Sequence, residues 1–192
     1  ARSRQRPDLR PAPEIRVPNA GNLRPAAEIR APSSGTPRTN GIKSEKYEKM
    51  AVKYYTDDCS YRLPRKRLTA EWLRRVAEAE GYELGDVSYI FCSAQRLLEM
   101  NRQYLGHDYF TDVITFDYSD RKGARVISGD IFIDVETVAD NARLYGFPTL
   151  QEMRRVVVHG VLHLCGQGDK TPRTNAQMHR KEDKYLKFWE EQ

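Results

Sequence analysis

A histidine pair inside an apolar helical segment most constrains the fold of this chain. His159 and His163 stand four residues apart, and valines and leucines fill most positions around them, from Val156 to Leu164. Residues at i and i+4 share one face of a helix, so both imidazoles can point at a single ion. Because the other faces are apolar, the helix has to be buried against other elements. The segment therefore predicts a buried helix that carries two convergent metal ligands.

The residues that follow supply a turn and a third ligand. Gly166 comes three residues after His163, and Asp169 comes three residues after Gly166. Glycine readily ends a helix, and the returning chain can bring an aspartate toward the two imidazoles. Zinc accepts histidine and aspartate ligands, and three protein ligands leave a fourth position open, as in catalytic zinc sites. The pattern predicts one zinc ion per chain, held by His159, His163 and Asp169.

The residue after the first histidine limits the chemistry. In zinc proteases built on a similar helix this residue is a glutamate, which acts as the general base. Here it is Gly160, so a protease built on this helix would lack its proton acceptor. Cys165 lies two residues beyond His163, on the wrong side of a helix to join the ligands. We expect it to be a buried thiol.

The net charge of +5 is not spread evenly over the 192 residues. The first 40 residues hold eight arginines against three acidic residues, and the rest of the chain holds equal numbers of basic and acidic side chains. The first 40 residues also contain seven of the ten prolines and no aromatic residue, a composition typical of disorder. We therefore divide the chain into a disordered Pro/Arg-rich extension, residues 1–49, and a globular domain, residues 50–192.

Two interpretations of the extension remain open. It is either a basic arm for RNA or an acidic partner, or an upstream segment without function, since Met50 would be a natural start. The globular domain is neutral overall, so net charge gives no support to nucleic-acid binding. The chain has no run of 18 apolar residues, no signal-peptide pattern and no C-x-x-C motif among its three cysteines. A cytoplasmic protein without a membrane segment is expected.

Strand-like and helix-like segments alternate from residue 51 onward. Runs rich in β-branched and aromatic residues predict strands at 51–56, 87–92, 113–118 and 126–135, the last two forming a hairpin. Helical periodicity predicts helices at 69–80, 93–104 and 136–145, the histidine helix from residue 149, and a last helix from residue 174. The predicted N-caps are Thr69, Ser93, Thr149 and Thr174. His179, on the exposed side of the last helix, is expected to be inert.

This order of elements predicts the fold class. We expect a single α/β (α+β) domain in which helices cover a small mixed sheet. The metal site is expected on a buried helix and the loop after it.

Together these residues resemble the YbeY family of bacterial endoribonucleases. The match covers residues 50–190 and rests on four blocks in the family's order: Leu98-Glu-Met-Asn101-x-x-Tyr104, Thr111-Asp112-Val113-Ile-Thr-Phe116, Gly129-Asp130-Ile131 and His159-Gly-x-Leu-His163-Leu-x-Gly166. The resemblance implies a single-strand-specific, zinc-dependent endoribonuclease acting in 16S rRNA 3′-end maturation and ribosome quality control. Its implied partners are ribosomal RNA and the small ribosomal subunit or assembly factors.

Three positions depart from the family pattern. The third ligand of the family is usually histidine, and here it is Asp169. The family usually has tyrosine where this chain has Gln167, and commonly has an arginine implicated in RNA cleavage where this chain has Leu105. Two alternatives therefore stay open, a non-catalytic zinc-containing ribosome-assembly factor and another metal-dependent hydrolase.

Six further residues are candidates for the site. His107 and Asp112 could transfer protons, or they could be a solvated loop histidine and a turn carboxylate. A basic cluster could follow the phosphates of a single strand, although such clusters more often form a solvated face. Its members are Arg62, Arg65, Lys66 and Arg67.

Overall fold

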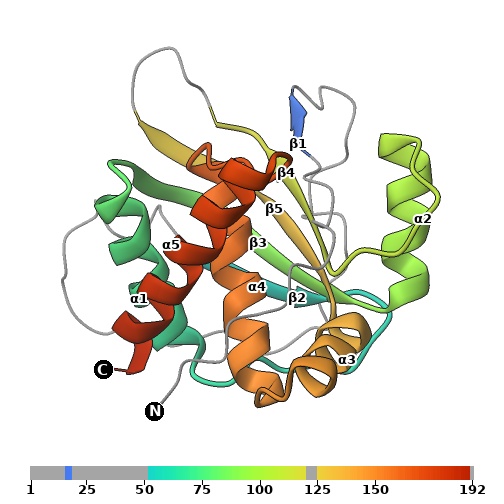
Figure 1. The fold of residues 1–192 in the computed structure, drawn as a ribbon. Helices are drawn as coiled ribbons and strands as arrows, with labels where there is room; N and C mark the ends of the chain where they lie inside the picture. The colour runs from blue at the N-terminus through green and yellow to red at the C-terminus, as the bar shows by residue number, and fades with distance from the viewer. Residues whose placement is uncertain (1–15, 19–51, 120–124, 191–192) are drawn as a thin grey trace, which may run out of the picture.

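The computed structural model describes residues 16–18, 52–119 and 125–190. These residues form a mixed sheet with helices on both faces (Figure 1). The strands are β1 (Arg16–Pro18), β2 (Val52–Thr56), β3 (Glu83–Cys92), β4 (Val113–Asp117) and β5 (Val126–Asp134). The helices are α1 (Lys66–Ala79), α2 (Ala94–Leu105), α3 (Val135–Tyr145), α4 (Thr149–Leu164) and α5 (Pro172–Glu190). The predicted class, one α/β domain with a small mixed sheet, is confirmed.

The strand order across the sheet is β1-β4-β5-β3-β2. β4 and β5 pair antiparallel, as the predicted hairpin requires, and the other neighbouring strands pair parallel. The turn of the hairpin, residues 120–124, lies outside the described residues. Of residues 1–49 the structure describes only β1, which pairs with β4. The disorder of this extension therefore stays a prediction.

The sheet separates two cores. Side chains alternate along β3, so Tyr89 and Phe91 face the larger core while Ile90 and Cys92 face the smaller one. Helices α1 and α4 cover the first face, α5 packs on these two helices, and α2 covers the second face. Burial on both faces explains why β3 and β5 are apolar over most of their length. In Figure 1, α4 lies between the sheet and α5, and α4 makes contact with both.

Two glycines let α4 approach the sheet closely. A Cβ at Gly160 would lie 2.7 Å from Cγ2 and 2.9 Å from Cδ1 of Ile131 on β5. A Cβ at Gly129 would overlap the carbonyl oxygen of Phe116 and lie 2.8 Å from Cδ2 of Leu164. Position 160 therefore faces the sheet, which explains why it holds a glycine and could not present a glutamate to a metal ion.

Helix starts follow the sequence only in part. Ser93 is the N-cap of α2, since its Oγ accepts a hydrogen bond from Arg96 N at 3.2 Å, as predicted. The predicted cap Thr69 is wrong, because α1 begins at Lys66 and the Thr69 hydroxyl instead donates to Arg65 O inside the helix. A threonine hydroxyl can bond the preceding turn as readily as it caps.

The other two predicted caps are shifted by nearby prolines. The N-cap of α4 is Pro148 rather than Thr149, and its carbonyl accepts hydrogen bonds from the backbone of Gln151 and Glu152. α5 begins at Pro172, which fits the first helical position because it lacks an N–H group there. The hydroxyl of Thr171 accepts a hydrogen bond from the backbone N–H of Thr174 at 3.2 Å, and the hydroxyl of Thr174 accepts one from the backbone N–H of Thr171 at 3.0 Å.

Among the described residues, no helix is both long and apolar enough to cross a membrane.

Candidate metal centre

Three side chains meet at the carboxyl end of α4. The Nε2 atoms of His159 and His163 lie 2.7 Å apart. Oδ2 of Asp169 lies 3.7 Å from Nε2 of His159 and 3.8 Å from Nε2 of His163. His163 and Asp169 are buried, and the His159 side chain is 15% exposed. This group is therefore able to hold a metal ion from one accessible side.

The end of α4 brings Asp169 back to the histidines. Gly166 has a φ of +90°, which glycine adopts without strain. Gly166 N donates to His163 O at 2.8 Å, and Gln167 N donates to Leu162 O at 2.9 Å. This pair of bonds is a Schellman motif, which reverses the chain direction. The predicted end of the helix at Gly166 is confirmed, and the reversed chain returns Asp169 to the site.

The outer nitrogens of both imidazoles are fixed by acceptors. Nδ1 of His163 lies 2.8 Å from Gln167 O, and a carbonyl oxygen can only accept, so this nitrogen carries a proton. Nδ1 of His159 lies 2.7 Å from Oε1 of Glu182, a carboxylate, and donates to it. Held in this way, both imidazoles turn their Nε2 atoms toward each other and toward Asp169. A proton shared by the two Nε2 atoms, or a metal ion bound by both of them, would offset the repulsion between their lone pairs.

The donor set fits zinc. Zinc bonds of about 2.1 Å in a tetrahedron separate two ligand atoms by about 3.4 Å. The three observed separations, 2.7, 3.7 and 3.8 Å, lie on either side of this value. Two imidazole nitrogens and one carboxylate oxygen are also ligands that zinc prefers, and second hydrogen bonds orient both imidazoles as in many zinc sites.

Glu182 on α5 contacts the candidate metal centre, and the sequence analysis did not identify it. It is buried and accepts hydrogen bonds from His159 at 2.7 Å, His179 at 3.1 Å and Arg155 at 3.1 Å. Burial raises the pKa of Glu182, but these hydrogen bonds and the charges of His159 and Arg155 hold the pKa well below its usual range. His179 is therefore part of the network, and the expectation that it is functionally inert stays a prediction.

A signal for Glu182 was present in the sequence. It stands four residues after Met178 and three before Tyr185, inside the apolar face of α5. A carboxylate on an apolar face needs a buried partner. The same network acts on His159: burial lowers its pKa, but the hydrogen bond to Glu182 and the charges of Glu182, Asp112 and Asp169 raise the pKa above its usual value.

The structure places the two proton-transfer candidates differently. Asp112 lies just before β4, and Nδ2 of Asn141 donates to Oδ2 of Asp112 at 3.4 Å. The negative charge of Asp112 helps to raise the pKa of His159. His107 lies in the loop after α2, and its Nδ1 lies 3.0 Å from the Tyr109 hydroxyl. Asp112 is thus near the metal centre, whereas His107 interacts within its own loop.

The basic cluster lies on another element. Its four side chains are exposed around the start of α1, rather than on α4 and the loop after it. The residues are Arg62, Arg65, Lys66 and Arg67.

Cys165 is buried, as expected, and burial raises the pKa of its thiol to about 12. It is not among the side chains that meet at the metal centre.

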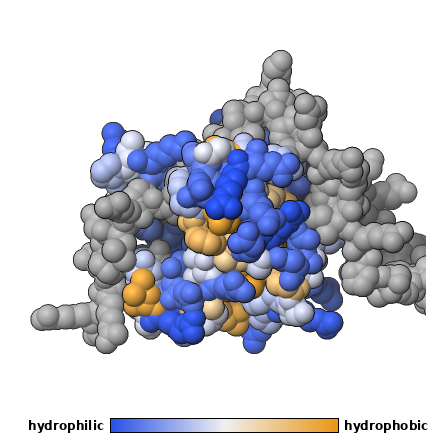
Figure 2. Space-filling view, turned by 90° about the vertical axis from the view of Figure 1, so that its right-hand side faces the viewer, coloured by the Kyte–Doolittle hydropathy of each residue, from blue (hydrophilic) through white to orange (hydrophobic). Residues whose placement is uncertain are grey.

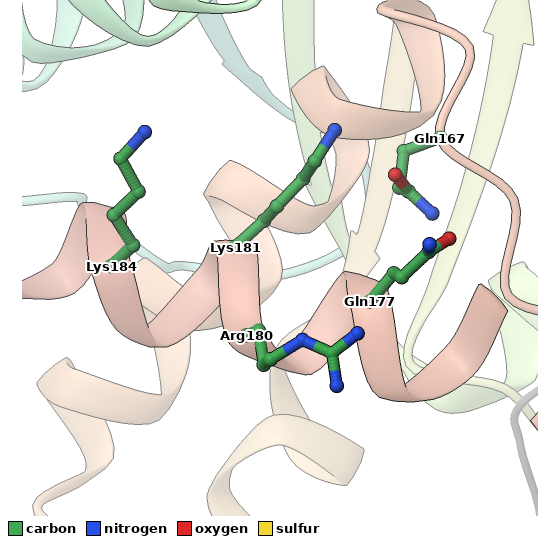
Figure 3. Close-up of a pocket in the computed structure, with 5 residues that line it drawn as sticks. All are labelled: Gln167, Gln177, Arg180, Lys181 and Lys184. Atoms are coloured by element: carbon green, nitrogen blue, oxygen red, sulfur yellow. The ribbon is translucent and has the colours of Figure 1, made fainter. Parts of the chain in front are cut away.

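A pocket of about 310 Å³ lies beside the loop that follows α4. Figure 3 shows Gln167 from that loop and four residues of α5, with the polar ends of Lys181, Gln167 and Gln177 near one another and Lys184 farther along α5. Lys181 is held by Glu80 of the α1 C-cap at 2.6 Å. Arg180 also lines the pocket, so the N–H donors and positive charges around the pocket suit an anion such as a phosphate.

Comparisons with known proteins identify the family of this chain. Residues 52–190 match the family model described as Endoribonuclease YbeY. Proteins named Endoribonuclease YbeY from Parabacteroides distasonis and Bacteroides thetaiotaomicron are 44% and 47% identical over 137 residues. The matches cover 71% of this chain and 94% and 98% of those proteins.

A solved structure shares the architecture. The solution structure of TM1509 from Thermotoga maritima superposes with a TM-score of 0.51 at 25% sequence identity. The similarity covers 72% of this chain and 89% of that one. On the family match and on the identity to these relatives over most of their length, the chain belongs to the YbeY endoribonuclease family.

Proposed function

We propose that this chain is a single-strand-specific, zinc-dependent endoribonuclease of the cytoplasm that acts in 16S rRNA 3′-end maturation and ribosome quality control. Family membership supports the reaction class. The observation that supports the metal dependence is the convergence of the His159 Nε2, His163 Nε2 and Asp169 Oδ2 atoms, which lie 2.7 to 3.8 Å from one another. Two imidazole nitrogens and a carboxylate oxygen are ligands that zinc accepts.

Three protein ligands suit a catalytic rather than a structural site. His159, His163 and Asp169 would hold the zinc ion and leave a position open on the exposed side of His159. When bound, zinc supplies Lewis acidity, which stabilises negative charge on a phosphoryl oxygen. The carboxylate of Asp169 donates more electron density than the histidine usual in the family, so the ion would be less Lewis-acidic.

Asp112 is the better candidate for the general base. Its carboxylate is close enough to act on His159, and Asn141 holds it in place. A carboxylate in this position could accept the proton of a ribose 2′-hydroxyl, which RNA has and DNA lacks. Asp112→Asn should then lower the cleavage rate while zinc content stays unchanged. Loss of zinc in this variant would assign Asp112 to the structure of the metal centre instead.

The partners follow from the substrate. We propose that single-stranded ribosomal RNA is the substrate and that the small ribosomal subunit or its assembly factors deliver it. The exposed cluster Arg62, Arg65, Lys66 and Arg67 offers phosphate contacts at the start of α1. Replacing two of its members with glutamate should weaken RNA binding and reduce the dependence of that binding on salt.

One observation favours a non-catalytic assembly factor instead. Leu105 is half-buried against the smaller core, so this chain has an apolar contact where the family commonly has an arginine implicated in cleavage. The guanidinium of the nearby Arg102 is engaged by Asp108 at 2.6 Å. If the missing charge limits the rate, Leu105→Arg should raise it by about tenfold or more. If both proteins are inactive, hold zinc and bind ribosomal particles, the assembly-factor function is favoured.

The direct test of substrate class compares three nucleic acids. Purified zinc-loaded protein is incubated with a labelled single-stranded RNA, the same RNA in a duplex, and DNA of the same sequence. The proposal predicts internal cleavage of the single-stranded RNA alone. Precursor 16S rRNA with its 3′ extension is then cut, and fragment ends are mapped. Cleavage of DNA at the same rate would contradict a role for the 2′-hydroxyl, and ends far from the mature terminus would contradict the maturation function.

A further inference from the structure

Exposed aromatic side chains gather at the end of α2 and in the loop that leads to Asp112. Six large hydrophobic side chains are exposed in the described part of the chain, and three of them fall between residues 104 and 110. Within the loop that follows α2, residues 107–110, Phe110 is 60% exposed and Tyr109 is 38% exposed. The His107 ring stacks on the Tyr109 ring at a centroid distance of 5.2 Å. Burial in the core explains none of these rings.

The 107–110 loop is held rigidly. Asn101 of α2 is buried, and its side-chain Nδ2 donates to the backbone carbonyl of Tyr109 at 2.7 Å. The backbone carbonyl of Asn101 accepts a hydrogen bond from the backbone N–H of His107. Arg102 of α2 binds Asp108 at 2.6 Å. These bonds fix the backbone on both sides of the exposed rings, so a ligand that binds them does not have to order the loop first.

The loop leads directly into the metal centre. Phe110 is two residues before Asp112, and two residues span at most about 7 Å. The charge of Asp112 in turn helps to raise the pKa of His159, and its carboxylate accepts a hydrogen bond from Asn141. Phe110 is therefore within two residues of a carboxylate whose charge acts on the pKa of the predicted ligand His159.

The composition of the loop suits bases better than a protein partner. Its exposed large side chains, Tyr109 and Phe110, are aromatic and follow the charged Asp108, and no exposed aliphatic residue accompanies them. Figure 2 faces the side of the molecule on which α2 lies in Figure 1, and there hydrophobic residues appear as small separate groups among hydrophilic ones. A protein interface usually presents a continuous apolar centre. Separate rings instead match the flat faces of unstacked bases.

We propose that Phe110 and Tyr109 form a stacking platform for unpaired bases of a single-stranded RNA next to the phosphodiester that is cut. This proposal rests on the proposed function and adds the reason for single-strand specificity. Bases inside a duplex are already stacked on both faces and cannot stack on the loop. A flexible strand can turn a base onto the rings and so place its neighbouring phosphate at the metal centre.

Equilibrium binding tests the platform apart from cleavage. The full zinc-loaded chain is titrated into fluorescein-labelled 2′-O-methyl RNA, which is checked for intactness on a gel, and anisotropy is measured. Phe110→Ala and Phe110→Leu should weaken binding about five- to hundredfold, as for other stacked bases. Phe110→Trp should retain the affinity. Phe188→Ala, at an exposed phenylalanine on α5, is the matched control and should bind as the wild type does.

A strand with abasic positions separates base stacking from other contacts. On this strand the wild type should lose affinity, and Phe110→Ala should then differ from the wild type by less than twofold. Equal affinity of wild type and Phe110→Ala for the normal strand would overturn the platform while leaving the endoribonuclease proposal intact. Retained affinity in Phe110→Leu would show an apolar contact without stacking and would also overturn it. Absence of any binding by the wild type would overturn both proposals.

Discussion

His159 donates its Nδ1 proton to Oε1 of Glu182 over 2.7 Å, and this contact links the metal centre to α5. Glu182 is buried and is itself held by Arg155 and His179. The contact turns Nε2 of His159 toward His163 and makes the imidazole a stronger base. Glu182 is thus a positioning residue, because it acts on the ion only through His159.

The first prediction concerns the metal affinity of a Glu182 variant. Glu182→Gln keeps a hydrogen-bond acceptor but removes the charge, and it should weaken zinc binding about 10- to 100-fold. Competition with a chromophoric chelator measures the affinity. Asp183→Asn removes another partner of Arg155 without touching His159, and should bind zinc as the wild type does. Equal affinities of the Glu182→Gln variant and the wild type would show that the contact only stabilises the fold.

The second prediction concerns the third ligand. Asp169→His restores the ligand usual in the family and should keep about one zinc per chain, whereas Asp169→Ala should lose most of it. Elemental analysis after dialysis gives the ratio. His159→Ala combined with His163→Ala should bind none. Full occupancy of that double variant would place the ion elsewhere, and loss of zinc from Asp169→His would show that the loop accepts only a carboxylate.

The third prediction concerns the approach of α4 to β5. Gly160→Ala puts a methyl group 2.7 Å from Ile131 Cγ2, and should destabilise the protein by about 1–3 kcal/mol. Alanine favours an ordinary helix by about 1 kcal/mol over glycine, so a net loss identifies the clash. Denaturant unfolding measures the change. In an Ile131→Ala background the loss should shrink, and an unchanged loss would locate its cause away from Ile131.

The fourth prediction concerns pH and Glu80 at the end of α1. Lys181 and Tyr185 donate to its carboxylate, both at 2.6 Å, and although burial raises the pKa of Glu80, these bonds and the charge of Lys181 lower it below its usual value. Its stabilising contribution is therefore present above the unfolded-state pKa, near 4.5, and is lost as pH falls through the lower folded-state pKa.

Glu80→Gln should accordingly cost about 1–3 kcal/mol of unfolding free energy at pH 7. The difference from the wild type should be smaller at pH 3 than at pH 7, because the wild-type carboxylate takes up protons as pH falls through its folded-state pKa. Unfolding curves at both pH values test this, with Glu78→Gln, exposed on the same helix, as the control. A difference that is the same at both pH values would mean that the charge of Glu80 contributes nothing.

The sequence predicts local features of this fold well, because local chemistry decides them. Ser93 caps α2 since its hydroxyl reaches the third amide of the helix, and Gly166 ends α4 since it adopts a positive φ. The spacing of His159, His163 and Asp169 likewise follows from one helix and one turn. Thr149 was wrong as a cap because Pro148 precedes it and takes that position.

Long-range features could not be predicted. The order β1-β4-β5-β3-β2 depends on pairings between strands far apart in the chain, which no local pattern encodes. Glu182 joins His159 across 23 residues and two helices, so only its position on an apolar face indicates it. The close contact of Gly160 with Ile131 also appears only when α4 is packed on β5.

The most direct test of the account is cleavage of single-stranded RNA by the wild type and by His163→Ala, with and without zinc. The wild type should cut an end-labelled single strand internally, lose this activity to a chelator and recover it when zinc is added back. His163→Ala should stay inactive at the same zinc concentration while its melting temperature shows a folded protein. Undiminished cleavage by His163→Ala, or intact RNA with fully zinc-loaded wild type, would contradict the account.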